Sequence, residues 1–257
     1  QASCNFHLAD RVVTVSKNYL EEVSKELELG YDFRDILKIR KDHRTFFGII
    51  NGYDKKLISP NEKKINTINE FFGNSDFKFF DEKTIANKKH NKSEFVKLIS
   101  RLAKDDSYKK QIIPLIDTYK FEDIEKDIKD INKTPIVCAT SRLVEQKGYD
   151  IAAQAILAWI KTHHKENIEF PIFVLGGAGS VELFKMLTKL KDKVAKICPE
   201  AAKRIYVFHG YKDQFAYAIQ LASDFYMMPC RFEPCGLTQM EAMAKGDYGV
   251  QSELEKT

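Results

Sequence analysis

Residues 135–249 alternate between two hydrophobic patterns. Short apolar runs without intervening polar residues are typical of strands buried on both faces of a sheet. Four such runs occur, at residues 135–139, 171–175, 205–208 and 224–228. After each run, apolar residues recur at steps of three and four, the spacing of one helix face; these segments are residues 152–160, 183–197, 213–222 and 236–245. This order predicts the α/β fold class, with a Rossmann-like, doubly wound parallel sheet and helices on both faces.

The first 134 residues are patterned more weakly. An apolar run at residues 12–16 predicts a buried strand, which a polar helix around residues 18–29 and a turn at residues 51–52 follow. Further on, the chain is rich in Lys, Asn, Asp and Glu, but apolar residues keep helical spacing at residues 94–102 and 121–131. We therefore expect helices joined by solvated loops rather than disorder.

These differences in composition and hydrophobic pattern divide the chain into three parts. They are residues 1–59, a charged helical insert or linker at residues 60–134, and the Rossmann-like domain at residues 135–257.

The composition excludes several classes of protein. Hydrophobic residues make up 44% and charged residues 30% of the chain, and 41 basic against 37 acidic residues leave a formal charge of +4. No Lys/Arg cluster is interleaved with aromatic residues, so a nucleic-acid partner is not indicated. No apolar run approaches the ~18 residues of a membrane-spanning helix, and the first residues do not resemble a signal peptide. The five cysteines form no CxxC pair, so neither a disulfide framework nor a zinc site is indicated, and we expect reduced thiols in a cytoplasmic protein. We expect no metal site and no cofactor.

Parallel sheets bind ligands beyond the carboxyl ends of their strands. In the first such loop, Arg142 and Lys147 place two cations five residues apart, directly before Gly148. Arginine offers a planar fork for phosphate oxygens and lysine a mobile point charge. The alternative is that both are ordinary solvated charges. In the second loop, Gly177 leaves room for phosphate to approach the backbone, although a tight turn would also account for it.

The loop after the fourth strand is the most informative. It reads Arg-Phe-Glu-Pro-Cys-Gly-Leu-Thr-Gln over residues 231–239. Glu233 can accept hydrogen bonds from two sugar hydroxyls and stabilise positive charge at an anomeric carbon, or it can merely favour the dipole of the following helix. The unpaired amides at the start of that helix can face an anion or sugar hydroxyls. Cys235 has no base nearby in the sequence that would make it a nucleophile.

These two loops together resemble the glycogen/starch synthase family of retaining glucosyltransferases. Residues 9–16 and 50–54 resemble the same enzymes in the same order, so the similarity runs from residue 9 to about residue 246. It implies the GT-B fold, in which two Rossmann-like domains surround a cleft. It also implies transfer of glucose from ADP-glucose, or less often UDP-glucose, to the 4-hydroxyl at the non-reducing end of an α-1,4-glucan, with retention.

The resemblance also implies roles for individual residues. Arg142 and Lys147 would bind the diphosphate of the donor, and Glu233 would contact the transferred glucose. Further substrate contacts would come from Tyr211, near the nucleotide base or else at the edge of the core, and from Cys235, Gly236, Leu237 and Thr238.

The chain also departs from the family pattern. Residues 1–59 resemble only the tail of the N-terminal GT-B domain and the crossover between domains. After residue 246 the family continues with a strand, whereas residues 247–257 here are polar and unrelated. We therefore expect a truncated sheet and an inactive fragment, in the cytoplasm or, in a plant or alga, in the plastid. A non-catalytic nucleotide-sugar or glucan-binding remnant and another GT-B glycosyltransferase are the alternatives.

Overall fold

The chain forms two compact units. The computed structural model describes residues 6–52, 61–73, 75–80, 84, 86–246 and, by backbone alone, 248–251. The smaller unit contains residues 1–54 and 232–237, and the larger unit contains residues 55–231 and 238–257.

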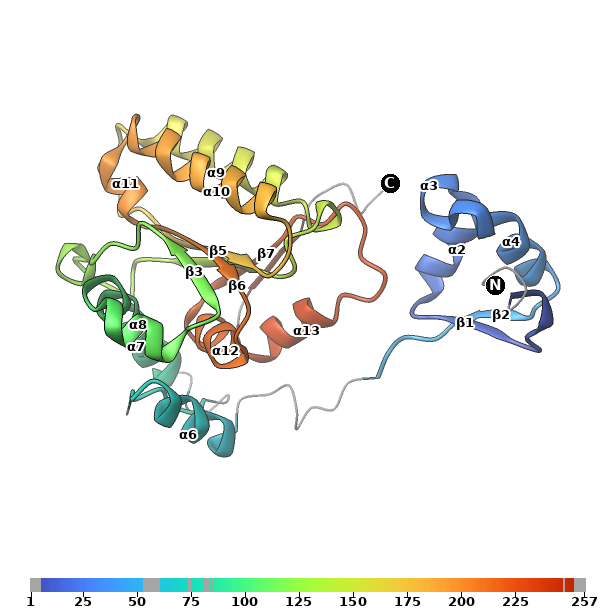
Figure 1. The fold of residues 1–257 in the computed structure, drawn as a ribbon, viewed down its shortest axis with the longest axis horizontal. Coiled ribbons are helices and arrows are strands. Elements are labelled where there is room, and N and C mark those ends of the chain that lie inside the picture. The colour runs from blue at the N-terminus through green and yellow to red at the C-terminus, as the bar shows by residue number, and fades with distance from the viewer. Residues whose placement is uncertain are drawn as a thin grey trace. The chain divides into compact units, whose positions relative to one another are not determined.

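A six-stranded sheet forms the centre of the larger unit (Figure 1). Its strand order is β3-β6-β5-β4-β7-β8, and every pair is parallel except β3 with β6. The strands are β3 (Ile116–Tyr119), β4 (Ile136–Thr140), β5 (Ile172–Gly177), β6 (Ile205–Gly210), β7 (Phe225–Met228) and β8 (Tyr248–Gln251). The four apolar runs thus form β4 to β7, as predicted.

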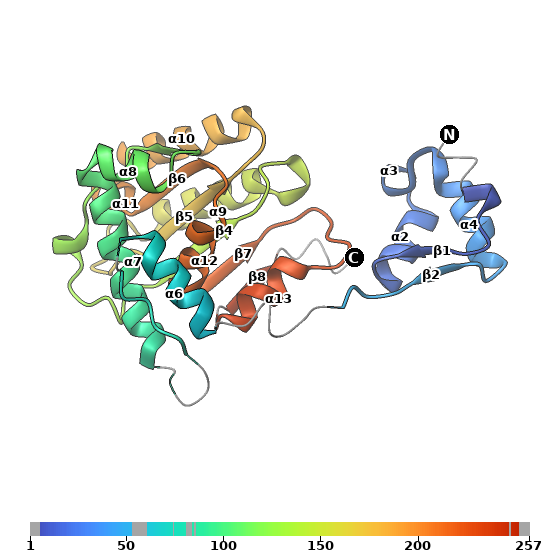
Figure 2. The ribbon, with the colours of Figure 1, turned by 60° about the horizontal axis from the view of Figure 1, so that its bottom comes forward.

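Helices cover both faces of this sheet, as Figures 1 and 2 show. One face carries α9 (Tyr149–His163), α10 (Val181–Ala195) and α11 (Pro199–Lys203). The other carries α6 (Glu62–Phe71), α7 (Ala86–Lys104), α8 (Asp106–Ile112), α12 (Asp213–Ala222) and α13 (Leu237–Ala244). Alternate residues of one strand enter opposite cores: Val174 packs in the core that contains α7 and α12, and Leu175 in the core that contains α9 and α10. The predicted α/β fold, with a mainly parallel sheet between two helical layers, is confirmed.

Two predictions for the larger unit were wrong. Residues 121–131 form only a 3-10 turn at Glu125–Asp127. The Asp123 carboxylate accepts the Glu125 amide (3.2 Å) and the Asp130 carboxylate accepts the Asn132 amide (3.0 Å), and such local bonds compete with a helix. A strand also follows residue 246, because β8 pairs in parallel with β7. An edge strand pairs through its backbone and can be polar. Residues 247 and 252–257 lie outside the described residues.

The region at residues 60–134 packs closely on the sheet. Lys92 on α7 is buried and forms an ion pair with the partly exposed Asp224 (2.8 Å), whose carboxylate also accepts the Ile136 amide at the start of β4. The Lys88 ammonium donates to two carbonyl oxygens, that of Gln220 in the last turn of α12 (3.1 Å) and that of Lys245 directly after α13 (2.8 Å). The division at residues 59 and 134 stays a prediction, but α7 and β3 lie in the larger unit.

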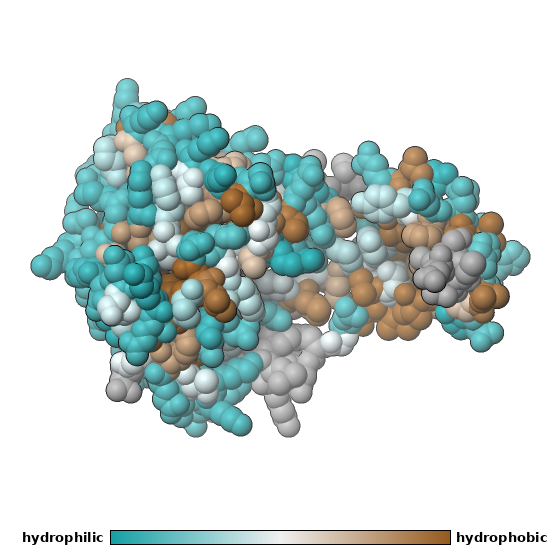
Figure 3. Space-filling view, in the orientation of Figure 1, coloured by the Kyte–Doolittle hydropathy of each residue, from teal (hydrophilic) through white to brown (hydrophobic). Residues whose placement is uncertain are grey.

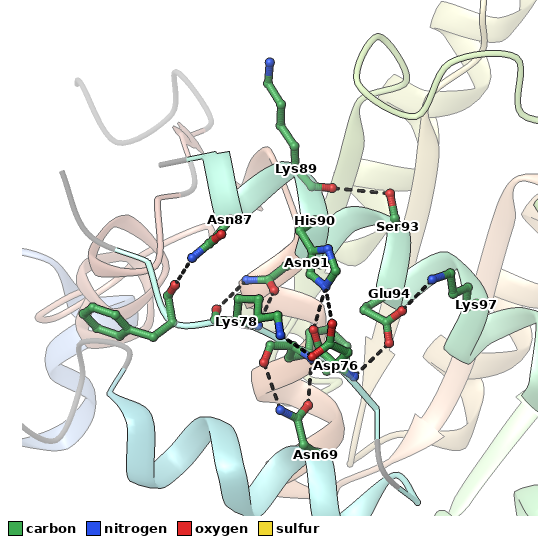
Figure 4. Close-up of polar contacts among 12 residues, drawn as sticks. Asn69, Asp76, Lys78, Asn87, Lys89, His90, Asn91, Ser93, Glu94 and Lys97 are labelled. Carbon is green, nitrogen blue, oxygen red and sulfur yellow. Dashed lines mark hydrogen bonds and ion pairs between the residues drawn. The ribbon is translucent and has the colours of Figure 1, made fainter. Parts of the chain in front are cut away.

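Asparagine side chains hold the extended segment at residues 75–80 (Figure 4). Asn69 bonds both the amide and the carbonyl of Phe77, at 2.7 and 2.9 Å. Asn91 does the same for Lys78, at 2.7 and 3.0 Å. These amide side chains take the place of a neighbouring strand, so the segment can lie against α6 and α7 with its backbone groups paired.

The smaller unit contains a two-stranded parallel sheet and short helices. The strands are β1 (Val12–Thr14) and β2 (Phe46–Gly48), and the helices are α2 (Lys17–Lys25), α3 (Leu27–Gly30), a 3-10 turn (Tyr31–Phe33) and α4 (Arg34–Asp42). The predicted strand is present but not buried, since Val13 is 57% exposed. Figure 3 shows hydrophobic side chains on this unit's surface. The predicted helix at residues 18–29 divides at Glu26. Tyr53 and Asp54 of the 50–54 motif lie outside the described residues.

Candidate functional site

The strand order marks one edge of the larger unit as a ligand site. From β4 the chain winds outward through β5 and β6, and then returns to the other side of β4 with β7. The winding therefore reverses between β4 and β7. Open α/β sheets bind ligands beyond the carboxyl ends of the strands at such a switch point. The two loops that flank it are residues 141–148, with both predicted phosphate cations, and residues 229–236.

The loop after β4 is held in place by buried Tyr149. Its hydroxyl accepts a hydrogen bond from the Ser141 amide (2.9 Å) and donates one to the Gly176 carbonyl (2.9 Å). Burial raises the pKa of this hydroxyl. The loop after β4 also pairs with the loop after β5, because the Leu143 amide donates to Ala178 O and the Ser180 amide donates to Leu143 O, both at 2.8 Å. The backbone on both sides of Arg142 is thus held in place.

Arg142 is exposed and Lys147 is half-buried. Lys147 ends a 3-10 turn at Glu145–Lys147, and Gly148 then begins α9 in the left-handed conformation, with φ of 63°. A Cβ on Gly148 would lie 1.7 Å from the Pro229 carbonyl oxygen. The backbone of Pro229, in the loop after β7, thus packs directly against Gly148 and locks the two switch-point loops together.

Arg231 is a third cation at this edge, which the sequence did not single out by itself. Its Nη1 donates to Asp150 Oδ1 (2.9 Å) and to the Glu145 carbonyl (2.8 Å), and its Nη2 donates to Asp150 Oδ2 (2.7 Å). The Arg231 guanidinium holds the pKa of the Asp150 carboxyl below its usual value. The Arg231 side chain thus binds oxygens of the loop that carries Arg142 and Lys147, and of the helix that follows it.

The glycine-rich loop after β5 is built on a close backbone contact. A Cβ on Gly177 (φ 154°) would lie 1.8 Å from the Ser141 carbonyl oxygen. This contact supports the tight-packing alternative for Gly177, and its contact with phosphate stays a prediction. The His209 ring stacks on Phe184, with centroids 5.3 Å apart, and its Nε2 lies 3.0 Å from Gly179 O.

Tyr211 follows β6 at the same edge of the sheet. It is 59% exposed, so its ring lies on the surface rather than in the core. A hydrogen bond with Asp213, together with partial burial, raises the pKa of Tyr211 to about 12. The exposed ring can stack on a flat apolar ligand such as a nucleotide base.

Glu233 lies in a segment, residues 232–237, that belongs to the smaller unit. Its Oε1 accepts the Gly236 amide (3.3 Å), and Gly236 has φ of 75°. Cys235 and Leu237 are half-buried, as is Thr238 in the first turn of α13. The sheet thus brings Arg142, Lys147 and Tyr211 to one edge of the larger unit, whereas Glu233 belongs to the smaller unit.

A cavity of about 460 Å³ lies beside these loops. Its lining residues are Glu145, Asp150, Ser180, Glu182, Leu183 and Arg231. Three carboxylates outnumber one arginine there, so it is unsuited to a phosphate, and the predicted binding residues do not line it. Among the described residues, no group of three or more His, Cys, Asp or Glu side chains could hold a metal ion. No described helix is long and apolar enough to cross a membrane.

Comparison with known proteins agrees with this architecture. Residues 134–255 match the family described as glycosyl transferases group 1. A glycogen synthase of Hydrogenovibrio crunogenus is 28% identical over 239 residues, which are 93% of this chain and 39% of the relative. Granule-bound starch synthase 2 of Pisum sativum, chloroplastic/amyloplastic, is 29% identical over 242 residues, 94% of this chain and 26% of the relative.

The fold has a counterpart among solved structures. The catalytic domain of starch synthase IV from Arabidopsis thaliana, bound to ADP and acarbose, superposes with a TM-score of 0.66 at 23% identity, over 97% of this chain and 41% of that one. The chain spans roughly two fifths or less of the length of these relatives. The chain is therefore a homologue of the glycogen and starch synthases, with a glycosyl transferases group 1 domain at residues 134–255.

Proposed function

We propose that this chain supplies the donor-binding part of a retaining glucosyltransferase. The enzyme transfers glucose from a nucleotide sugar to the non-reducing end of an α-1,4-glucan. ADP-glucose is the proposed donor, in preference to UDP-glucose, and the ADP in the starch synthase IV structure supports this choice. The proposed location is the cytoplasm, or the plastid if the source is a plant or alga.

The observation that carries the proposal is the pair of cations at the switch point. In the reaction, the bond between the anomeric carbon and the diphosphate oxygen breaks, and the diphosphate leaves with its electron pair. Arg142 and Lys147 stabilise the charge that develops on this leaving group. The acceptor's 4-hydroxyl oxygen forms the new bond to the anomeric carbon. With retention it attacks the face that the diphosphate leaves, and its proton passes to an oxygen of the departing diphosphate.

The remaining predicted residues bind the rest of the donor. The exposed Tyr211 ring stacks on the base. The Glu233 carboxylate accepts hydrogen bonds from glucose hydroxyls and stabilises positive charge at the anomeric carbon. The amides of residues 235–237 and the Thr238 hydroxyl complete the sugar and phosphate contacts.

We further propose that the chain alone binds the donor without transferring glucose. The relatives that it matches are more than twice as long. Transfer requires an acceptor held in line with the donor and exclusion of water. In the complete synthase, residues outside this chain hold the acceptor and exclude water.

The test is Lys147→Ala in the complete synthase. Loss of a charge-assisted contact to the leaving group costs ~3–4 kcal/mol, so turnover falls by two to three orders of magnitude. Lys161→Ala, an exposed lysine on α9, is the matched control and leaves turnover unchanged. Wild-type turnover in Lys147→Ala contradicts the assignment. A complete protein that binds ADP-glucose but transfers no glucose would favour a non-catalytic binding remnant.

A further inference from the structure

Arg231, in the loop after β7, contacts the loop after β4 (residues 141–148) at several points. Its guanidinium forms a two-point ion pair with Asp150 in the first turn of α9, at 2.7 and 2.9 Å. It also donates to the Glu145 carbonyl (2.8 Å), and its own amide donates to the Gln146 carbonyl (2.8 Å). Arg231 therefore bonds the 3-10 turn and the helix that follows it.

That turn needs outside support. A 3-10 helix of three residues has few internal bonds and poorer hydrogen-bond geometry than an α-helix. Here its bonds are from the Lys147 amide to Val144 O and from the Gly148 amide to Glu145 O, both at 3.0 Å. Arg231 adds a bond to two of the turn's three carbonyls. These bonds tie the backbone that carries Lys147 to the loop after β7.

From this geometry we infer that Arg231 and Asp150 form a clamp that positions Lys147 for the donor's diphosphate. The inference rests on the proposed function. Arg231 is a positioning residue rather than a phosphate ligand, because both of its Nη atoms already donate to protein oxygens. A displacement of ~1 Å in a positioned group can cost a hundredfold in rate, so the clamp matters to the site although it does not touch the donor.

The clamp requires the fork of arginine and not only its charge. A lysine at position 231 keeps the positive charge but cannot form two parallel bonds to one carboxylate and also reach a carbonyl. Asp150→Asn keeps the shape of the carboxylate and removes its charge. These two variants therefore separate a geometric clamp from a general electrostatic effect.

The first experiment measures amide hydrogen exchange in the chain without nucleotide. Both Arg231→Lys and Asp150→Asn are expected to speed exchange of the Lys147 and Gly148 amides by roughly tenfold, a value reduced for partial exposure of the ion pair. The control is Asp192→Asn. It removes the charge of another surface carboxylate, which pairs with Lys120 at 2.8 Å, and leaves these amides unchanged. Wild-type exchange in Arg231→Lys would overturn the clamp.

The second experiment measures ADP and adenosine binding by ligand-observed NMR. Both clamp variants are expected to bind ADP severalfold more weakly, by at most roughly fivefold, the full value of one solvated charge pair, and to bind adenosine, which lacks the diphosphate, as the wild type does. Unchanged ADP affinity in both, with loss of ADP binding in Lys147→Ala, would overturn the clamp alone. Unchanged ADP affinity in Lys147→Ala would refute the proposed function, and with it the role of the clamp.

Discussion

Gly148→Ala tests how the two switch-point loops are locked together. In the left-handed conformation of Gly148, an alanine costs ~1–2 kcal/mol. Its Cβ would also lie 1.7 Å from the Pro229 carbonyl oxygen, so that oxygen would have to retreat by more than about 1 Å to reach even a tight contact. This movement strains or breaks the bond between the Arg231 amide and Gln146 O and weakens the clamp, at a cost of ~1–3 kcal/mol.

Gly73→Ala is the matched control. Gly73 has nearly the same conformation, with φ of 65°, but a Cβ there would meet nothing within 4 Å. Both substitutions also reduce the entropy of the unfolded chain equally, so their difference isolates the clash. We expect Gly148→Ala to lower the free energy of unfolding by about 3 kcal/mol and Gly73→Ala by about 1 kcal/mol. Their Tm values would then differ by ~4–8 °C.

The assay is urea and thermal unfolding followed by tryptophan fluorescence. The chain's single tryptophan, Trp159, lies in α9 and packs against Phe170 and Phe173 at ring distances of 6.2 and 6.5 Å. It therefore reports on the larger unit, which contains both glycines. Unfolding free energies of the two variants within about 1 kcal/mol of each other would refute the account of this loop contact.

Three further changes test other parts of the structure. Lys92→Ala removes the buried partner of the partly exposed Asp224 carboxylate and should lower the free energy of unfolding by about 2 kcal/mol, less than for a fully buried pair; a loss below ~1 kcal/mol in urea unfolding would show that the pair does not stabilise the fold. Glu233→Gln should lower turnover of the complete synthase at an unchanged Tm, and equal turnover in steady-state kinetics would exclude a role at the sugar. The pKa of Asp150 is lowered in the folded state, so the stability that its charge contributes is present above the ordinary pKa of 3.8 and is lost as the pH falls through the folded-state pKa. The difference in stability between wild type and Asp150→Asn should accordingly narrow below pH 3.8, and a constant difference in acid urea titrations would contradict the ion pair.

Periodicity predicted the central sheet well, because buried parallel strands are short and continuously apolar. It also predicted α12 at Asp213–Ala222 with its observed bounds. Elements held by polar contacts were harder to predict. The edge strands β3 and β8 lie outside the apolar runs. At residues 121–131, aspartate side chains bond the backbone and replace the helix that the apolar spacing predicted.

The site shows the same contrast. Spacing and loop position predicted that Arg142 and Lys147 lie at the edge of the sheet where the carboxyl ends of the parallel strands meet, and their binding of phosphate stays a prediction. The sequence did not reveal that Arg231 pairs with Asp150, since 81 residues separate them and only the fold brings them together. The contact between Gly148 and Pro229 was hidden for the same reason. In both cases the missing information is a tertiary contact between loops that are distant in sequence.

The central claim is that Arg142 and Lys147 hold the diphosphate of a nucleotide-sugar donor. Calorimetric titration of the chain with ADP, with adenosine as the reference ligand, tests it most directly. The account predicts ADP binding at roughly millimolar Kd, about −4 kcal/mol, because a solvated charge pair at 4 Å contributes only ~1 kcal/mol. It also predicts that Arg142→Ala and Lys147→Ala each weaken ADP binding and leave adenosine binding unchanged. ADP affinity that is the same in the wild type and in both variants would contradict it.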